Sequence, residues 1–335
     1  MSKFERFSTA GKTAAKVAGK HALHLGSQAF RSKESREEKN VEHYDEVAKE
    51  IFKTLSSLKG LALKAAQLMS LEFELLPPEF QKELRKACYQ APPLNRAVVR
   101  KVIQNQLGQA PELAFSSFNP DAFAAASIGQ VHKAESKNGD ALAVKIQYPG
   151  ITQTIHHDLG ILKILLLKLP IAGIKGKTAF VKTFLTELED RFLEETDYEL
   201  EAKSMTWFKE RNSIPHIKIP KVYPDYSAKT VLSMEYLRGR HLKEWLDSKP
   251  SKKERNHVAQ SLWDFFAYFF SKEQRFHADP NPGNYLIMDS GEIGILDFGC
   301  IKECDPDFPK QLGQMIEHYT QDDQDKIIQN LQSWG

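Results

Sequence analysis

The stretch that decides the fold runs from residue 277 to 299 and reads "HADPNPGNYLIMDSGEIGILDFG". Three of its oxygen-bearing side chains stand out by their spacing: Asn284 follows Asp279 by five positions, and Asp297 follows Asn284 by thirteen. Two prolines and a glycine between Asp279 and Asn284 predict a tight loop of fixed shape. The stretch therefore predicts oxygen ligands held in set positions, as catalysis by positioning requires.

This spacing is typical of phosphoryl transfer. H-x-D-x-x-x-x-N followed by D-F-G is the layout of kinase catalytic and metal-binding loops. Mg²⁺ prefers carboxylate and amide oxygens as ligands. We therefore expect Asp279 to orient the attacking hydroxyl or water, and Asn284 and Asp297 to bind Mg²⁺ on the phosphates of ATP.

A lysine upstream supports this interpretation. Residues 130–147, "QVHKAESKNGDALAVKIQ", form two alternating runs around Asn138-Gly139, which predicts a β-hairpin. The second run contains "LAVK" at 142–145, similar to the V-A-I-K strand whose lysine holds the α- and β-phosphates. A lone strand lysine is ordinarily solvated, but after a loop and a hairpin we expect Lys145 to bind phosphate.

The loop before this hairpin is rich in alanine. Residues 124–131, "AAASIGQV", fit the template G-x-G-x-x-G-x-V with alanine at the first two glycine positions. Glycine there permits φ > 0 and close approach to phosphate, which alanine restricts. We expect a phosphate loop of narrow conformational choice, formed by Ala124, Ala125, Ala126, Ser127, Gly129 and Val131.

A tetrapeptide downstream sits where an adenine-binding hinge would lie. Residues 234–237, "MEYL", follow the strand-like run "TVLS". We expect the backbone of Glu235 and Leu237 to address the base, although an ordinary strand end explains the same residues.

Residues 96–108 are predicted to form a helix that ends at Gly108, and the segment around 277–301 is predicted to form loops. Residues 179–211 read as one helix with many acidic side chains. Glu194, Asp197 and Glu201 would share a face of it, and we expect one of them to pair with Lys145.

Composition limits the other classes of function. The chain is 41% hydrophobic and 27% charged, and its net charge of +2 excludes a molecule that binds nucleic acid through overall charge. No apolar run reaches the ~18 residues of a membrane span. The three cysteines form no zinc-binding or redox motif. So small a number of cysteines indicates a reducing compartment, and we therefore expect a cytoplasmic protein.

The basic residues 1–30 predict a solvated arm, with a membrane-surface helix or a targeting peptide as alternatives.

With these motifs assembled, the sequence resembles the UbiB-type (ADCK, AarF) atypical kinase-like family. "AAASIGQV", "HADPNPGN", "LDFG", the acidic "ETDY" at 195–198 and "KAAQ" at 64–67 all resemble its hallmarks. The resemblance implies an α+β, bilobal protein-kinase-like fold with an N-terminal helical extension. Because the chain ends at Gly335, soon after the D-F-G motif, we expect a shortened C-lobe. The expected parts are a basic arm (1–40), the helical extension (41–110), an N-lobe (111–236) and a C-lobe (237–335).

The resemblance also implies a gating role for the extension. Its K-x-G-Q helix would bring Lys64 and Gln67 to the nucleotide pocket, where Lys64 meets Glu195 and Asp197. Glu201 is then our choice of partner for Lys145. Position 66 is alanine where the family pattern has glycine, which alters how closely that helix can approach.

The implied function is Mg²⁺–ATP binding with ATPase or small-molecule, lipid-linked phosphotransfer, in support of ubiquinone or isoprenoid-lipid metabolism. A membrane surface or an isoprenoid lipid is the implied partner of the N-terminal helices, in addition to the nucleotide. Two alternatives stay open: a phosphotransferase of the aminoglycoside or choline kinase type, and a non-catalytic nucleotide-binding scaffold.

The alanines yield a prediction. Ala126→Gly restores the backbone freedom of an ordinary phosphate loop, so we expect a changed ATP/ADP preference or new autophosphorylation. Nucleotide affinity and autophosphorylation assays check this expectation. Identical affinities and activity in the wild type and the variant would contradict it.

Overall fold

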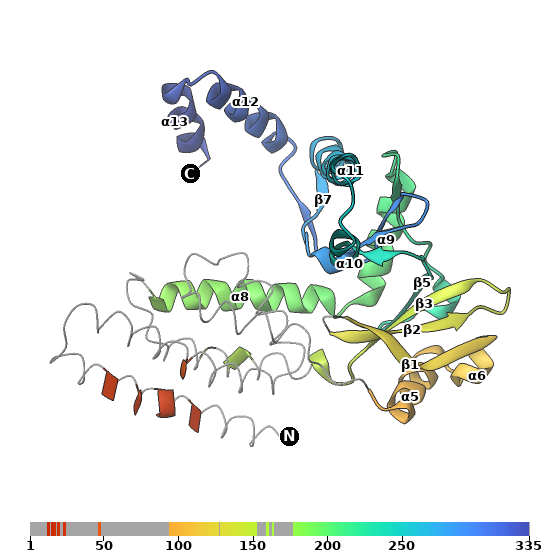
Figure 1. Ribbon diagram of the computed structural model, residues 1–335. Helices are drawn as coiled ribbons and strands as arrows, with labels where there is room; N and C mark the ends of the chain where they lie inside the picture. The colour runs from red at the N-terminus through yellow and green to blue at the C-terminus, as the bar shows by residue number, and fades with distance from the viewer. Residues whose placement is uncertain are drawn as a thin grey trace. The chain divides into compact units, whose positions relative to one another are not determined.

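The computed structural model describes residues 94–126, 128–152 and 177–334, with isolated residues between 12 and 47 and between 159 and 163 (Figure 1). The chain divides into two compact units. Unit 1 consists of residues 1–139, 144–197 and 229–231, and unit 2 consists of residues 140–143, 198–228 and 232–335. The domain boundaries drawn from the sequence stay predictions.

One sheet has four strands in the order β1-β2-β3-β5. They are β1 (Ser117–Ala126), β2 (Gly129–Glu135), β3 (Ala141–Gln147) and β5 (Val231–Glu235). Gly139 has a φ of 87° in the turn between β2 and β3, where its N–H donates to the Ser136 carbonyl at 3.0 Å. The predicted hairpin is confirmed, and glycine suits this turn because it adopts positive φ without strain.

Two helices precede the sheet and lie beside β1 (Figure 1). Helix α5 (Arg96–Leu107) begins at Asn95, whose side chain accepts the Ala97 N–H, and ends at Gly108 with a φ of 71°. Side-chain capping at the start and a left-handed residue at the end are the ordinary limits of a helix. The predicted helix over 96–108 is confirmed, and the short helix α6 (Pro111–Ala114) follows it.

The single helix expected over 179–211 is wrong, because two helices form there: α8 (Lys177–Glu195) and α9 (Tyr198–Arg211). At the break, the Thr196 hydroxyl donates to the Leu193 carbonyl at 2.8 Å. Such a local bond offers the backbone an alternative to the helix. Glu194 and Glu201 therefore belong to different helices, and the shared acidic face does not form.

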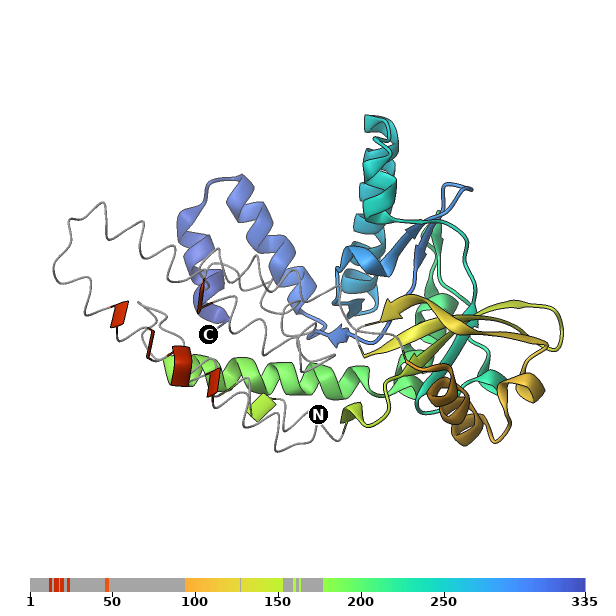
Figure 2. The same ribbon diagram turned by 60° about the horizontal axis from the view of Figure 1, so that its bottom comes forward.

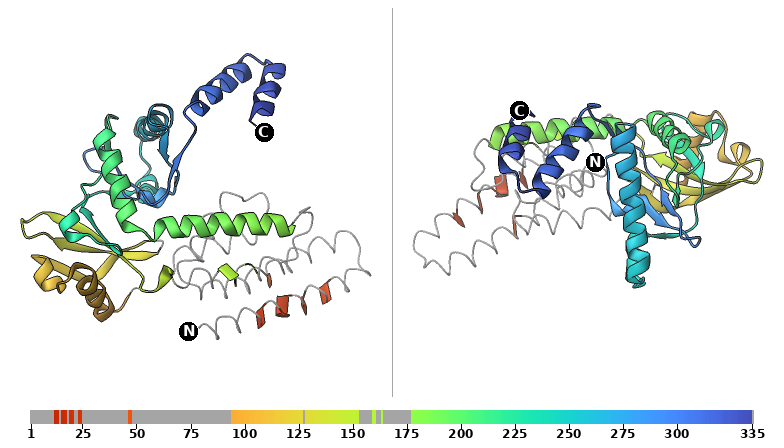
Figure 3. Two further views of the ribbon diagram at one scale, coloured as in Figure 1. Left: turned by 180° about the vertical axis from the view of Figure 1, so that it is seen from behind. Right: turned by 90° about the horizontal axis from the view of Figure 1, so that it is seen from above.

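Aromatic packing builds the interior of unit 2. The Phe208 ring of α9 lies 4.5 Å from Phe269 and 6.0 Å from Phe265, both on α11 (Lys252–Lys272), and 5.1 Å from Phe298. Figure 3 shows α11 as one uninterrupted helix. Offset and tilted aromatic pairs of this kind stabilise a core beyond simple area burial. Phe298 belongs to the D-F-G motif, so this core holds the motif in place.

Short strands flank that core, where the sequence had predicted only loops between 277 and 301. Strand β7 (Arg275–His277) pairs antiparallel with β10 (Ile301–Glu303). A second sheet has the order β4-β9-β8-β6, with β4 (Ile217–Lys218), β9 (Ile293–Ile295), β8 (Tyr285–Ile287) and β6 (Arg240–His241). The expectation of loops was wrong because strands of two or three residues are too short to show an alternating pattern.

Helix α10 (Leu242–Asp247) follows β6, and two 3₁₀ turns, Pro224–Tyr226 and Pro282–Asn284, lie in the loops. Helices α12 (Phe308–Thr320) and α13 (Gln324–Ser333) pack on each other as a hairpin (Figure 2). Within the described residues, no helix is long and apolar enough to cross a membrane.

Gly239 gives a prediction about this packing. A Cβ atom built there lies 2.6 Å from the Ile287 carbonyl oxygen, which is backbone and cannot move aside. We expect Gly239→Ala to lower the free energy of unfolding by about 1–3 kcal/mol, as overpacking does. Chemical denaturation measures this change.

Gly313 is the matched control, because it lies in helix α12 with no atom within 4 Å of the new Cβ. Gly313→Ala should raise stability by about 0.5–1 kcal/mol, since alanine favours a helix. Equal effects of the two substitutions would contradict the close approach at Gly239.

Candidate active site

Strand pairing brings Asn284 and Asp297 together in unit 2. Antiparallel β8 and β9 align Tyr285 with Ile295 and Ile287 with Ile293. The ladder extends by one more bond, in which the Leu296 N–H donates to the Asn284 carbonyl at 2.9 Å. Asn284 thus precedes β8 at the same end of the ladder at which Asp297 follows β9.

The pairing of β7 with β10 brings in Asp279 in the same way. The Ala278 N–H donates to the Cys300 carbonyl at 3.0 Å, so that Asp279 leaves this ladder beside the D-F-G segment. His277 Nε2 lies 2.7 Å from the Asp297 carbonyl oxygen. Since a carbonyl only accepts, His277 carries its proton on Nε2 and donates it to the backbone of the D-F-G motif.

Asp279 and Asn284 bond directly. Asn284 Nδ2 donates to the Asp279 carbonyl at 3.2 Å and to its Oδ2 at 3.1 Å. The Asn281 N–H donates to Asp279 Oδ1 at 3.3 Å, and the Gly283 N–H donates to Asn281 Oδ1 at 3.0 Å. The amide nitrogen of Asn284 is therefore committed to Asp279, and its Oδ1 is the atom suited to be a ligand.

These oxygens fit Mg²⁺. Asp297 Oδ1 accepts the Gly299 N–H at 2.9 Å, which fixes the orientation of the carboxylate. Mg²⁺ typically takes one or two protein oxygens and completes its shell with phosphate and water. Among the described residues, these loops included, no group of three or more His, Cys, Asp and Glu side chains could hold a metal ion, so a metal here would depend on the Asn284 amide oxygen and on phosphate and water as well. Asn284 Oδ1 and Asp297 are thus the suitable pair.

Burial, with a smaller effect of the Asp279 charge, raises the pKa of Tyr285 to about 12. The hydroxyl of Tyr285 stays protonated at neutral pH as a result. Its ring lies 6.4 Å from that of His277.

Glu201 lies beside the D-F-G backbone. It is 2% exposed, and its Oε1 accepts the Phe298 N–H at a long 3.5 Å. The sequence selects Glu201 as the partner of Lys145, which is 5% exposed on β3 of unit 1. That pairing stays a prediction.

Unit 1 also buries Glu195, which is 8% exposed at the end of α8. Gln147 Nε2 donates to the Thr196 carbonyl at 3.0 Å, joining β3 to the segment that follows Glu195. Lys145 and Gln147 are two positions apart on β3, so their side chains lie on the same face of the strand. Lys145 therefore lies on the face that meets the segment after Glu195. Asp197, at the break between α8 and α9, is half-buried.

The proposed hinge is held firmly at Glu235. Its N–H donates to the Lys221 carbonyl at 2.8 Å, and its Oε1 pairs with Lys218 Nζ at 2.9 Å. Burial raises the pKa of Glu235, but the bonds from Lys218 and Lys221 outweigh this and hold the pKa below its usual value. The predicted contacts of Glu235 and Leu237 with adenine stay predictions.

The alanine-rich loop is more regular than the sequence suggested. Ala124, Ala125 and Ala126 are strand residues of β1, paired with Val131, Gln130 and Gly129 of β2. None of the described residues of the loop has a positive φ. Alanine is tolerated because the strand backbone there does not need the freedom of glycine. Ser127, together with Lys64 and Gln67 of the predicted gate, lies outside the described residues.

Three residues with a structural part in the site were not assigned from sequence: His277, Gly239 and Lys218. His277 is visible in the motif, but its role depends on strand pairing. Gly239 and Lys218 act through contacts with β8 and Glu235, which no local pattern indicates.

Known proteins resemble this chain in sequence and in structure. The model of the ABC1 atypical kinase-like domain matches residues 86–331. The Arabidopsis thaliana protein ACTIVITY OF BC1 COMPLEX KINASE 7, chloroplastic, is 31% identical over 297 residues, covering 88% of this chain and 42% of its own length. The Saccharomyces cerevisiae atypical kinase COQ8, mitochondrial, is 29% identical over 268 residues, covering 79% and 52%. The chain spans about half the length of the curated relatives it matches.

A solved structure is also similar. The Mycobacterium tuberculosis protein Rv3197, solved as a complex with erythromycin, has a TM-score of 0.60 at 29% identity. The match covers 89% of this chain and 75% of that one.

The bond between Asn284 and Asp279 predicts the effect of a charge change. Asn284→Asp replaces the donor with a carboxylate facing Asp279, so we expect a loss of about 1–3 kcal/mol in the free energy of unfolding at neutral pH. Protonation of the new carboxyl at acid pH relieves the repulsion, so the penalty should shrink as the pH falls. Chemical denaturation across pH measures both effects.

Asn281→Asp is the control, because it makes the same change in the same loop. Asn281 uses its oxygen as an acceptor, which aspartate retains, so its cost should stay below about 0.5 kcal/mol. Equal costs at positions 281 and 284 would show that the Asn284 amide is not committed to Asp279.

Proposed function

Because the chain belongs to the ABC1 atypical kinase-like family, we propose that it binds Mg²⁺–ATP and transfers or hydrolyses the terminal phosphoryl group. The observation that carries the proposal is the bonded set in unit 2, in which Asn284 Nδ2 lies 3.1 Å from Asp279 Oδ2 and strand pairing places Asp297 alongside. A D…N…D set with these contacts supports phosphoryl transfer because that reaction depends on positioning and charge stabilisation.

Each residue has a role in the proposal. Asn284 Oδ1 and the Asp297 carboxylate would hold Mg²⁺, which when bound neutralises charge on the phosphates. The Glu235 carbonyl and the Leu237 N–H would contact adenine. Lys145 and the loop 124–131 would bind the phosphates, and Glu201 would orient Lys145.

Asp279 would orient the nucleophile and take its proton as the new P–O bond forms and the bond to the leaving phosphate breaks. A water nucleophile gives ATPase activity, and a hydroxyl gives a phosphorylated small molecule or lipid. Turnover of radiolabelled ATP with and without membrane lipid extract, following free phosphate and labelled products, separates these acceptors. The family resemblance supports an acceptor in ubiquinone or isoprenoid-lipid metabolism.

A membrane surface is the proposed partner of the N-terminal segment. Residues 1–31 carry Lys3, Arg6, Lys12, Lys16, Lys20 and Arg31 against Glu5. A basic amphipathic segment binds anionic lipid through charge and apolar contact, which agrees with peripheral attachment.

Asp297→Asn tests the metal role. The amide keeps the size of the side chain and removes the negative charge, so we expect loss of the thermal shift caused by Mg²⁺–ATP. Differential scanning fluorimetry with and without the nucleotide measures the shift.

Asp289→Asn is the control, an exposed aspartate between β8 and β9. It should keep the full shift. An undiminished shift in Asp297→Asn would remove the metal assignment, and nucleotide stabilisation without turnover would favour the scaffold instead.

A further inference from the structure

Two buried polar residues lie at the C-terminal end of the alanine-rich loop (124–131): Gln130 is within it and His132 follows it directly. Gln130 is 2% exposed and His132 is 0% exposed, both on β2. Buried polar side chains are costly unless they form hydrogen bonds, so the bonds of this pair set its orientation. Neither residue has a part in the chemistry proposed for Asp279.

The backbone before α5 fixes the Gln130 amide. The Leu94 N–H donates to Gln130 Oε1 at 2.7 Å. A backbone N–H is only a donor, so the oxygen of Gln130 must face Leu94 and the NH₂ group must face the other way. The NH₂ group therefore points at the ring of His132.

This orientation decides the tautomer of His132. Gln130 Nε2 lies 2.8 Å from His132 Nε2, which must therefore accept. The proton is then on Nδ1, which lies 2.9 Å from the Asn119 carbonyl of β1 and donates to it. The Phe118 ring stacks on the imidazole at 5.3 Å. All hydrogen bonds of the chain thus have the same direction: Leu94 donates to Gln130, Gln130 donates to His132, and His132 donates to Asn119.

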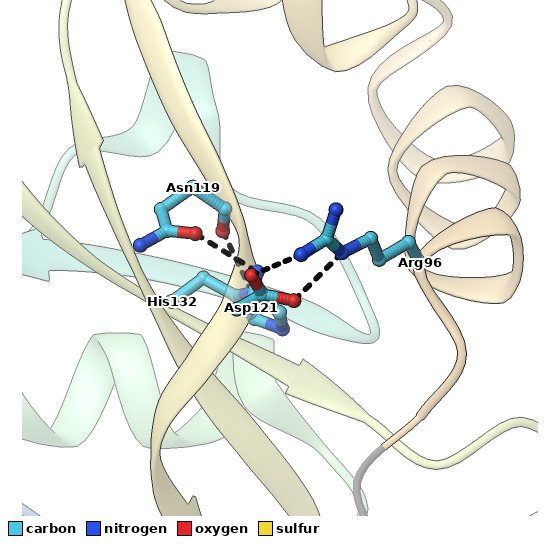
Figure 4. Close-up of polar contacts among 4 residues, drawn as sticks. All are labelled: Arg96, Asn119, Asp121 and His132. Atoms are coloured by element: carbon cyan, nitrogen blue, oxygen red, sulfur yellow. Dashed lines mark hydrogen bonds and ion pairs between the residues drawn. The ribbon is translucent and has the colours of Figure 1, made fainter.

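The same part of β1 is held from its outer side (Figure 4). Arg96 Nε donates to Asp121 Oδ1 at 2.7 Å, its Nη2 pairs with Oδ2, and the Asp121 N–H donates to Asn119 Oδ1 at 2.9 Å. Between Phe118 and Ala124 the register of β1 against β2 shifts twice. Backbone pairing in this irregular segment only weakly fixes the register of β1 against β2. The side-chain hydrogen bonds therefore have to fix that register.

We propose that Gln130 and His132 are positioning residues that set the register of the alanine-rich loop and connect it to the segment before α5. Immediately beyond the irregular segment, Ala124, Ala125 and Ala126 pair with Val131, Gln130 and Gly129. A shift of β1 at Asn119 would therefore also shift Ala124–Ala126, which are proposed to face the phosphates. The inference rests on the proposed nucleotide role of this loop.

The network works only with neutral His132. A proton on Nε2 would face the Gln130 NH₂ group, and turning the amide would instead place NH₂ against the Leu94 N–H. Burial lowers the pKa of His132, against the smaller raising effects of the Asn119 bond and of Asp121. The Asp121 charge is itself paired with Arg96, and the Phe118 ring covers the imidazole. His132 stays neutral near neutral pH.

Two substitutions of Gln130 test the proposal in the full chain. Gln130→Leu keeps the volume and removes both bonds, so hydrogen exchange at the amides of Ala124–Ala126 should rise about tenfold and the Kd for Mg²⁺–ATP by a similar factor. In Gln130→Glu the carboxylate accepts from Leu94 and from a protonated His132, so the pKa of His132 should rise. Once the pH exceeds that pKa, His132 loses its proton and the bond, and the Kd for Mg²⁺–ATP should increase. Proton–nitrogen NMR should show the Nδ1–H tautomer of His132 in the wild type.

Gln104→Glu, the same change at an exposed site on α5, is the control. It should leave the exchange rates at Ala124–Ala126, the Kd and the NMR signals of His132 unchanged.

An Nε2–H tautomer in the wild type, or unchanged exchange at Ala124–Ala126 in folded Gln130→Leu, overturns the inference. A Kd in Gln130→Glu that stays constant while His132 titrates also overturns it. If the wild type binds no Mg²⁺–ATP, the proposed function fails, and the tautomer and the exchange rates still decide whether the pair sets the loop register.

Discussion

The antiparallel pairing of β8 with β9 is the constraint on which the rest of the site depends. Three residues on each strand, extended by the bond from the Leu296 N–H to the Asn284 carbonyl, place the two proposed metal ligands at one end of a single ladder. The strands are too short to be stable alone. The aromatic core around Phe208 and the bond from His277 to the Asp297 carbonyl hold them, so the chemistry depends on packing beneath it.

Much of this could be predicted from the sequence because certain signals are local. Asn138-Gly139 predicts its hairpin through the φ that the turn requires, and Gly108 marks the end of α5 for the same reason. The spacing of Asp279, Asn284 and Asp297 is informative because a fixed loop and a short hairpin separate them. The family was also visible in the motifs, and the match over residues 86–331 confirms it.

Other features could not be predicted because they depend on contacts between distant residues. The Thr196 hydroxyl bonds to the Leu193 carbonyl at the helix break, but the helical sequence pattern continues on both sides of it, so no local signal marks the break. The alanines of the loop suggested restricted backbone freedom, whereas the structure shows paired strand residues that do not need it. The tautomer of His132 depends on a Leu94 N–H far away in sequence, so no window of residues contains it.

The central claim is that Asn284 and Asp297 hold the metal of a bound nucleotide. Paramagnetic broadening by Mn²⁺–ATP, in place of Mg²⁺–ATP, tests it most directly, because broadening falls steeply with distance from the ion. We expect the side-chain amide of Asn284 and the backbone amides around Asp297 to broaden first, while amides of α13 stay sharp. Broadening centred elsewhere in the chain, or none at saturating Mn²⁺–ATP, would contradict it.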